Sequence, residues 1–394
     1  MYSSIQRFVR VTVLSALLSL PFLANAEPLP NSPFEKTTST QQVRVLTYNV
    51  NCNYLQETSA DAALERILHA VQPDVIAFQE LPESAASNNP EALARLLEKK
   101  MKVIQPNTKW NAWVGKTDGI SRNAIVSRYP LSMTIRETTP PSNEVRGVNA
   151  ALVQLPSQAF DNTSLYLMNV NFKVGTSEGP QGDFARRQRH ADAVANWILD
   201  STTPAKMGRP AGDKINLKAR TPILIVGDYH FTDADREGKG PYHPARTLLR
   251  GEILDKKTYG EGRLPDWDGS TLSTVRPTPL SRTSESFMQT PGLAAHFIYT
   301  DSVFSPVRCV QVDSTLLSST QLKQTKLQQN DTTEVSKYLP TFADFVLGTS
   351  MPTAAPKVED APQKEGHSPS IPRNPLIFHD TDTETGPTLP TVNP

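Results

Sequence analysis

Nine short runs of apolar and β-branched residues constrain the fold of this chain more than any other feature of its sequence. They lie at 43–48, 75–78, 123–127, 148–155, 164–172, 222–226, 296–300, 307–313 and 340–347. Two segments, 59–71 and 184–199, carry apolar residues at helical spacing. Strands outnumber helices, so the sequence predicts an α+β sandwich of two mostly antiparallel sheets with the helices outside.

The helical segment 184–199 has two chemically different faces. One face carries Ala185, Gln188, Ala191, Val194, Ala195 and Ile198. The other carries Arg186, Arg187, Arg189 and His190, and we expect it to be the polar face of the helix.

The first 26 residues are typical of a secretory signal peptide. Arg7 and Arg10 precede a short apolar stretch, and Ala24-Asn25-Ala26 forms an A-x-A cleavage site. The alternative is an uncleaved membrane anchor, but the apolar run is short and Pro21 interrupts it. We therefore expect export to the periplasm or the medium, no transmembrane helix in the mature chain, and a mature chain that begins near Glu27.

Composition divides the remaining chain into three parts. Residues 27–42 are polar and are predicted to be a flexible lead-in, and 43–349 are predicted to form one domain. Residues 350–394 form a proline-rich tail that is predicted to be disordered, because few apolar residues are present to offset the ordering entropy.

Charge and cysteine content limit the classes of partner. The formal net charge is +0, which gives no strong signature of nucleic-acid binding. The chain has 2 cysteines, Cys52 and Cys309, which form either one disulfide or two thiols, and the sequence does not decide between them.

Polar residues recur where the predicted strands end. Asn49, Glu80 and Asn171 each follow an apolar run, and the run 223–226 is followed by Gly227, Asp228 and His230. A single polar residue at a strand end is usually turn chemistry. Several of them at one rim of a sandwich are how a rigid scaffold gathers the residues of a site.

A series of short motifs resembles the endonuclease/exonuclease/phosphatase superfamily, which includes DNase I-like nucleases, sphingomyelinases and inositol-phosphate phosphatases. In order, the motifs are TYNV (47–50), FQEL (78–81), SRNAIVSRYPL (121–131), RGVNAALV (146–153), LMNVNF (167–172), GDYH (227–230) and YLPTFADF (338–345). The resemblance implies a four-layer α/β/β/α sandwich and Mg²⁺-dependent hydrolysis of phosphate esters. It places Glu80, Asn49 and Asp228 at the metal.

Several positions depart from the pattern that the resemblance implies. Asn171 stands where the family has His, and His230 stands where it has Asn. Ala295 replaces an acidic residue, and Lys337-Tyr338 replace the Asp-His pair of a terminal S-D-H-x-P motif. A phenol, with an ordinary pKa of about 10, does not exchange protons near neutrality as an imidazole does. We therefore interpret Asp228, His230 and Asn171 as a degenerate catalytic site.

Other ligands for this site follow from the same residues. Asp228, His230, Glu80, Asn171 and His296 could form a softer site for Zn²⁺ or Mn²⁺. A phosphate or other anion could be held by fixed cations, for which the candidates are Arg122, Arg146 and Lys337. Asp331 and Glu334 could replace the missing acid, although we expect the polar insert 318–335 to be a solvated loop and His243 to be a surface residue.

The sequence thus leaves two main functions and a weaker third. The favoured one is an exported protein with lost or strongly reduced phosphoesterase activity that still binds an anionic ligand or a protein partner. The second is an active divalent-metal-dependent phosphodiesterase, nuclease or sphingomyelinase-like hydrolase with a rebuilt site. The third, a structural envelope protein, depends only on the proline-rich tail. The cofactor is Mg²⁺ in an active enzyme, with Mn²⁺ or Zn²⁺ as alternatives, and none in a silent one.

Overall fold

The structure is a computed structural model that describes most of the region between the two ends of the chain. The described residues are 32–36, 41–135, 148–202, 216–231, 235, 241–275, 277–279 and 297–348. All of them belong to one compact unit, Met1–Ser350. The predicted signal peptide 1–26 and the predicted tail 350–394 lie outside the described residues, as do Arg146, Ala295 and His296.

Two sheets form the centre of the molecule. One has seven strands in the order β10-β12-β13-β1-β2-β4-β3. Its strands are β1 (Gln42–Asn49), β2 (Val75–Pro82), β3 (Asn111–Thr117), β4 (Ser121–Ser127), β10 (Thr278–Pro279), β12 (Phe304–Gln311) and β13 (Thr341–Leu347).

The other sheet has six strands in the order β5-β6-β7-β8-β11-β9. They are β5 (Leu131–Ile135), β6 (Asn149–Gln154), β7 (Ser164–Asn171), β8 (Ile223–Asp228), β9 (Ser273–Val275) and β11 (Phe297–Tyr299). Of the strand pairs that the described residues form, only β1–β2, β7–β8 and β10–β12 are parallel, which confirms the prediction of mostly antiparallel sheets.

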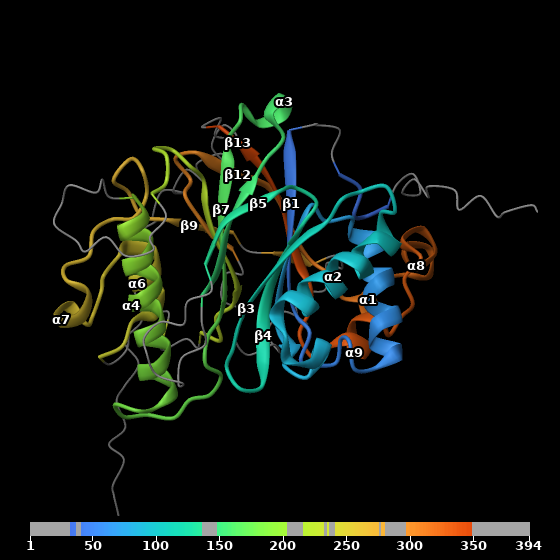
Figure 1. The fold of residues 1–394 in the computed structure, drawn as a ribbon, viewed down its shortest axis with the longest axis horizontal. Helices are drawn as coiled ribbons and strands as arrows, with labels where there is room; N and C mark the ends of the chain where they lie inside the picture. The colour runs from blue at the N-terminus through green and yellow to red at the C-terminus, as the bar shows by residue number, and fades with distance from the viewer. Residues whose placement is uncertain are drawn as a thin grey trace, which may run out of the picture. The chain divides into compact units, whose positions relative to one another are not determined.

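Helices cover the outer face of each sheet (Figure 1). Beside the seven-stranded sheet lie α1 (Thr58–Val71), η1 (Ala85–Asn88), α2 (Pro90–Ile104), η3 (Ser314–Leu316), α8 (Ser319–Thr325) and α9 (Asp331–Val335). Beside the six-stranded sheet lie α4 (Asp183–Thr202), α6 (Pro244–Arg250) and α7 (Lys256–Tyr259), and the short α3 (Ser157–Phe160) joins β6 to β7. The predicted four-layer α/β/β/α sandwich is therefore confirmed.

Strand alternation separates the hydrophobic cores. Along β1, Val43 and Val45 belong to the cluster between the two sheets, whereas Leu46 and Tyr48 belong to the cluster under α1 and α2. A third cluster packs the six-stranded sheet against α4 and α6. Because both faces of the central strands are buried, their sequences read as nearly continuous apolar runs.

The nine predicted strands and both predicted helices are present, with ends shifted by a few residues. The sequence analysis missed β3, β5 and the long helix α2. It was wrong about part of α4, because Arg187 and His190, expected on the polar face, are 0% and 1% exposed. It was also wrong about 318–335, which contains α8 and α9 rather than a solvated loop.

The predicted flexible lead-in is corrected at Ser32–Lys36, a segment that we call the N-terminal strap. Phe34 is buried in the hydrophobic cluster under α1 and α2. Its ring meets that of Phe342 edge to face, with 6.0 Å between the ring centres. Lys36 Nζ donates to Asp74 Oδ2 at 2.7 Å, and Arg308 donates to the carbonyl oxygen of Glu35 at 3.0 Å. The polar lead-in is ordered here because one aromatic side chain finds a place in the core.

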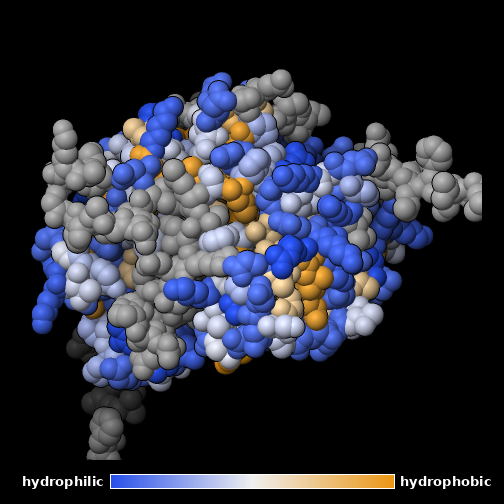
Figure 2. Space-filling model, in the orientation of Figure 1, coloured by the Kyte–Doolittle hydropathy of each residue, from blue (hydrophilic) through white to orange (hydrophobic). Residues whose placement is uncertain are grey.

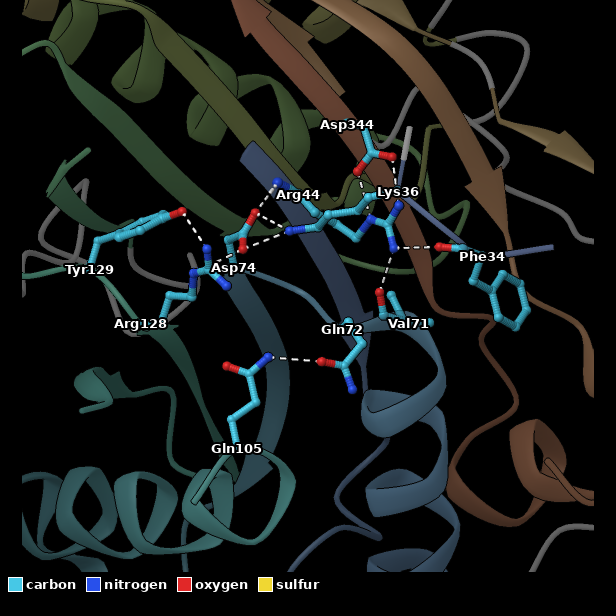
Figure 3. A network of polar contacts seen from close by, with 10 residues as sticks. All are labelled: Phe34, Lys36, Arg44, Val71, Gln72, Asp74, Gln105, Arg128, Tyr129 and Asp344. Carbon is cyan, nitrogen blue, oxygen red and sulfur yellow. Dashed lines mark hydrogen bonds and ion pairs between the residues drawn. The ribbon is translucent and has the colours of Figure 1, made fainter. Parts of the chain in front are cut away.

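A network of buried charges holds the strap to the first strand (Figure 3). Arg44 forms a two-pronged pair with Asp344, with Nε–Oδ1 and Nη2–Oδ2 distances of 2.6 and 2.7 Å, and donates to the carbonyl oxygen of Phe34 at 2.7 Å. Asp74 also accepts from the backbone N–H of Arg44 at 2.7 Å and pairs with Arg128 at 3.0 Å. Every charged group of this network has an opposite partner, as burial of charge requires.

The surface seen in Figure 2 is mostly hydrophilic, with small separated hydrophobic areas. The large hydrophobic side chains that are exposed are Ile120, Val174, Leu254, Leu264, Val307 and Leu316. Among the described residues, no helix combines the length and the hydrophobicity needed to cross a lipid bilayer.

Candidate functional site

Two pairs of parallel strands, one pair in each sheet, end at the same rim of the sandwich. Asn49 at the end of β1 lies beside Gln79 of β2, and Asn171 at the end of β7 lies beside Asp228 of β8. Their carboxyl ends meet because side-chain hydrogen bonds join the sheets at this level. We call this rim the site pole, and the rim that holds the strap the anchor pole.

Asp228 is the centre of one group of contacts at the site pole. Its Oδ2 atom accepts a hydrogen bond from Asn49 Nδ2 at 3.1 Å and lies 3.2 Å from His230 Nε2. Asn49 Oδ1 in turn accepts from the backbone N–H of Asn51 at 2.9 Å. The structure thus brings together three residues that the sequence analysis proposed.

Glu80 reaches the rim through a bulge. Residues alternate along β2, so Ala77 and Gln79 face the other sheet and Glu80 would face the helices. The pairing of β2 with β4 shifts register between Phe78 and Leu81, and Glu80 has a φ of +55°. The bulge turns Glu80 toward Asn171, whose Nδ2 lies 3.4 Å from Glu80 Oε1.

A buried amide network forms the floor beneath these residues. Gln79 Nε2 donates to Asn169 Oδ1 at 2.7 Å and to Thr47 Oγ1 at 3.1 Å. Asn169 Nδ2 donates to the carbonyl oxygens of Phe78 and Ala124 at 2.9 and 3.0 Å. The network links the two sheets directly, so it fixes the separation of the strand ends that carry Asn49, Glu80 and Asn171.

Gly227 is required where β8 approaches β7. Its φ is +136°, and a Cβ atom there would lie 1.9 Å from the carbonyl oxygen of Val170. Only glycine fits, because any side chain would collide with the neighbouring backbone. This close approach places Asp228 next to Asn171.

Aromatic residues pack behind the strand ends, on the side of α4. Phe172 stacks on His190 at 4.2 Å between ring centres and meets Tyr229 and Phe231 edge to face. Burial raises the pKa of Tyr229 well above its usual value, and its hydroxyl donates to the carbonyl oxygen of Ile225 at 2.9 Å. Tyr229 therefore belongs to the support of the site and supplies no titrating group near neutrality.

The Lys337-Tyr338 segment lies at the same pole. The rings of Tyr338 and His230 meet edge to face at 5.8 Å between centres. Lys337 is exposed, and its Nζ atom lies 5.1 Å from the centre of the Tyr338 ring. A phenol is thus the side chain next to His230, and the ammonium lies over that phenol.

The residues proposed to bind phosphate are not gathered in one place. Arg122 is buried and donates to the carbonyl oxygens of Gly115 and Asn88 at 3.1 and 3.0 Å. Its guanidinium therefore already has backbone acceptors. Arg146 lies outside the described residues, so Lys337 is the one of the three whose described side chain is exposed.

The remaining candidate residues have other positions. Asp331 is buried and pairs with Arg66 at 2.7 Å, so it does not replace the missing acid. His243 is half-buried rather than a plain surface residue, and its backbone N–H donates to Gln188 Oε1 at 2.6 Å. His296, the second imidazole of the proposed softer metal site, lies outside the described residues.

A buried ion pair behind the site was missed from the sequence. Arg187 of α4 pairs with Asp235 at 2.8 Å, and both side chains are 0% exposed. Arg187 also donates to the carbonyl oxygens of Lys173 and Gly175, at 3.0 and 2.7 Å. Arg187 therefore holds the loop after β7 to Asp235, which follows β8. In the sequence, only the run of arginines in α4 could have indicated this ion pair.

Glu80, Asp228 and Asn171 are the side chains at the site pole that could offer oxygen atoms to a divalent cation. The acidic groups are Glu80 and Asp228, and the described residues contain no cluster of three or more His, Cys, Asp or Glu that could hold a metal. Asn171 adds a buried amide oxygen that has no hydrogen-bond partner among the described residues. Carboxylate and amide oxygens are donors for hard cations such as Mg²⁺, which usually keep several water ligands, and the imidazole of His230 is a donor for Mn²⁺ or Zn²⁺. A bound ion of this kind would polarise a phosphate oxygen.

Several solved structures are similar to this chain at low sequence identity. Humanized D. rerio TDP2 with 14 mutations is 13% identical, with a TM-score of 0.45 and coverage of 78% of this chain and 99% of that chain. An endonuclease/exonuclease/phosphatase from Beutenbergia cavernae DSM 12333 is 14% identical, with a TM-score of 0.46 and coverage of 78% and 72%. ANGEL2, a 2',3'-cyclic phosphatase in complex with adenosine-2',3'-vanadate, is 12% identical, with a TM-score of 0.47 and coverage of 79% and 97%.

Sequence comparison gives the family. No curated protein matches the chain. The model of the Endonuclease/Exonuclease/phosphatase family matches residues 46–282, which include the strand ends that carry Asn49, Glu80, Asn171 and Asp228. This match covers more than half of the 394 residues, and the chain therefore belongs to the Endonuclease/Exonuclease/phosphatase family.

Proposed function

We propose that this protein uses the family scaffold mainly for binding, with hydrolysis of phosphate esters lost or strongly reduced. In this proposal the site pole holds a divalent cation through Glu80 and Asp228, and the cation holds an anionic ligand. In this proposal the ligand binds only when Mg²⁺ or Mn²⁺ is present. A protein partner could contact the same rim.

The position of Tyr338 beside His230 carries the proposal. The family resemblance places an Asp-His pair at 337–338, and the phenol that stands there meets His230 at 5.8 Å. Loss of one general acid or base typically lowers a rate by about 10²- to 10⁴-fold. The ammonium of Lys337, in place of a carboxylate, also removes a charge that would attract a cation.

The charge of the site supports binding through an ion rather than direct capture of an anion. Glu80 and Asp228 are acidic, and the guanidinium of Arg122 donates to backbone carbonyls. An anionic ligand would meet like charge at the rim unless a divalent cation lay between them. We therefore expect binding of inorganic phosphate to require Mg²⁺ or Mn²⁺.

Restoring the missing pair tests the proposal. The purified chain and the double variant Lys337→Asp/Tyr338→His are incubated with bis(p-nitrophenyl) phosphate and Mg²⁺ or Mn²⁺. We expect very slow hydrolysis by the wild type and at least about tenfold faster hydrolysis by the double variant. Adding Glu80→Gln to the double variant should abolish the gain. Brisk hydrolysis by the wild type that is lost in Asp228→Asn would refute the proposal.

An active hydrolase with a rebuilt site is the second candidate. Asn49, Glu80 and Asp228 stand together at the strand ends, and this retention favours it. Wild-type turnover that is lost on Asp228→Asn would establish this candidate instead.

We also propose that the chain is exported and cleaved after Ala26. The strap begins at Ser32, so this cleavage would leave Phe34 in the mature protein to fill its place in the core. N-terminal sequencing of protein recovered from the periplasm or the medium should begin at Glu27. An intact N-terminus in the membrane fraction would contradict cleavage.

A further inference from the structure

A buried oxygen atom at the site pole accepts no hydrogen bond from the part of the chain that the structure describes. Asn171 is 0% exposed, and its Oδ1 atom accepts no hydrogen bond from the described residues. Nearly all buried polar side-chain atoms in folded proteins are paired. An exception inside a candidate site points to a ligand that the protein itself does not supply.

The neighbouring carboxylate fixes the orientation of this amide. Asn171 Nδ2 lies 3.4 Å from Glu80 Oε1, so the N–H group faces the carboxylate. Turning the amide by half a rotation would place Oδ1 against the carboxylate, with two acceptors facing each other. The Asn171 amide is therefore held with its nitrogen next to Glu80. Its Oδ1 atom is the one left without a hydrogen bond from the described residues.

Asp228, whose side chain is 13% exposed, carries a second oxygen that could face an ion. Both side-chain contacts that it makes, with Asn49 and His230, involve Oδ2, which leaves Oδ1 without a hydrogen bond from the described residues. Asn171 and Asp228 are neighbours in the parallel register of β7 and β8. At alternate positions before them, Leu167 on β7 and Val226 on β8 face the other sheet, so the side chains of Asn171 and Asp228 share that face.

We propose that Asn171 is a direct ligand of a divalent cation, through Oδ1, together with Glu80 and Asp228. The proposal rests on the binding function above and adds a ligand specific to this chain. Carboxylate and amide oxygens are the donors that hard cations prefer. At position 171 the imidazole expected from the family would offer nitrogen, whereas the amide offers oxygen. The residue thus changes from a group that faces the substrate to one that faces the ion.

Manganese binding tests this assignment without any measurement of activity. The purified full chain is titrated with Mn²⁺, and free Mn²⁺ is followed by electron paramagnetic resonance together with calorimetry. Asn171→Leu should weaken binding by at least about tenfold, because loss of even an outer-shell partner typically costs 10- to 100-fold in affinity. Asn171→Asp keeps an oxygen in place and adds charge, so it should bind Mn²⁺ at least as tightly as the wild type. Asn107→Leu, at an exposed turn before β3, is the matched control and should bind as the wild type does.

The outcomes separate this assignment from the proposed function. Equal Mn²⁺ affinity of Asn171→Leu and wild type would overturn the assignment, as would a wild type that binds no Mn²⁺. If circular dichroism shows that Asn171→Leu is unfolded, Asn171→Asp decides, and weaker binding by this variant overturns the assignment. Brisk wild-type hydrolysis would instead refute reduced turnover and leave Asn171 as a ligand.

Discussion

The two ends of strands β1 and β2 differ in the partners of their charged side chains. At the anchor pole, Asp74 meets Lys36, Arg128 and a backbone N–H, and Arg44 meets Asp344 in a two-pronged pair. At the site pole, Glu80 and Asp228 have amide and imidazole neighbours, and two oxygen atoms, one each on Asn171 and Asp228, have no partner among the described residues.

Under the proposed function, this difference separates residues that stabilise the fold from residues that would bind the ion. Paired buried charges cost much free energy when one partner is lost, because the other is left without compensation. Residues at functional sites are often not optimal for stability, and substitutions there commonly leave stability unchanged or raise it. The contrast can be tested by equivalent substitutions at the two poles.

The largest effect is expected at Arg44. Arg44→Met leaves the Asp344 carboxylate buried without its partner, and should lower the free energy of unfolding by about 3 to 5 kcal/mol. Urea denaturation followed by circular dichroism measures the loss. The double variant Arg44→Met/Asp344→Leu should recover much of it. If the single variant is as stable as the wild type, the anchor pole does not depend on this pair.

A somewhat smaller loss is expected at Phe34. Phe34→Ala removes a buried ring that meets Phe342, and should cost about 3 kcal/mol, near the low end for such cavities because the strap can adjust. The same variant should increase proteolysis between the strap and β1. Unchanged stability and protease resistance would show that burial of Phe34 does not contribute to the stability of the fold.

Substitution at the site pole should have a much smaller effect on stability. Glu80→Gln removes one of two acidic groups at the rim, and the free energy of unfolding should stay within about 0.5 kcal/mol of the wild type or rise slightly. The same variant should lose Mn²⁺ binding. A loss of stability above about 2 kcal/mol would mean that Glu80 is a structural residue and would remove the contrast between the poles.

The two thiols should differ in reactivity without any change in stability. Cys52 is partly exposed just beyond β1 and Cys309 is buried in β12, and the two do not form the disulfide left open by the sequence. Burial raises the pKa of the Cys309 thiol, so the reactive thiolate is scarce. A thiol reagent should label one cysteine in the native protein and two in urea. Labelling of neither cysteine before reduction would indicate a disulfide.

The raised pKa of Cys309 also sets a direction for pH. Above the ordinary pKa of a thiol, the unfolded chain loses this proton before the folded chain does. Stability should therefore fall as the pH rises through that range, and Cys309→Ala should reduce the slope.

The sequence predicted the strands well because the central strands are apolar on both faces. It missed α2 although Asn89 caps the helix and Pro90 begins it, and it mistook 318–335 for a loop although Ser318 and Gln321 form a capping box. Both signals were legible in the sequence. The polar composition of 318–335 outweighed its capping box, whereas α2 also carries Leu93, Leu97 and Met101 at helical spacing.

The geometry of the site could not be predicted in the same way. Asn49 and Asp228 are 179 residues apart, and their hydrogen bond depends on the packing of two sheets. Simple alternation would have turned Glu80 toward the helices, and only the bulge in β2 brings it to the rim. The ordered strap likewise depends on a space in the core for Phe34, which a polar segment does not reveal.

The position of the strap has a practical consequence for handling the protein. Ser32–Lys36 is fastened beside Arg44 and Arg308, at the end of β1 farthest from Asn49. A bead or sensor surface linked through the residue before Ser32 would be joined to that end of the molecule. Immobilised in this way, the protein would leave the opposite rim, with the partly exposed Glu80 and Asp228, turned toward the solution.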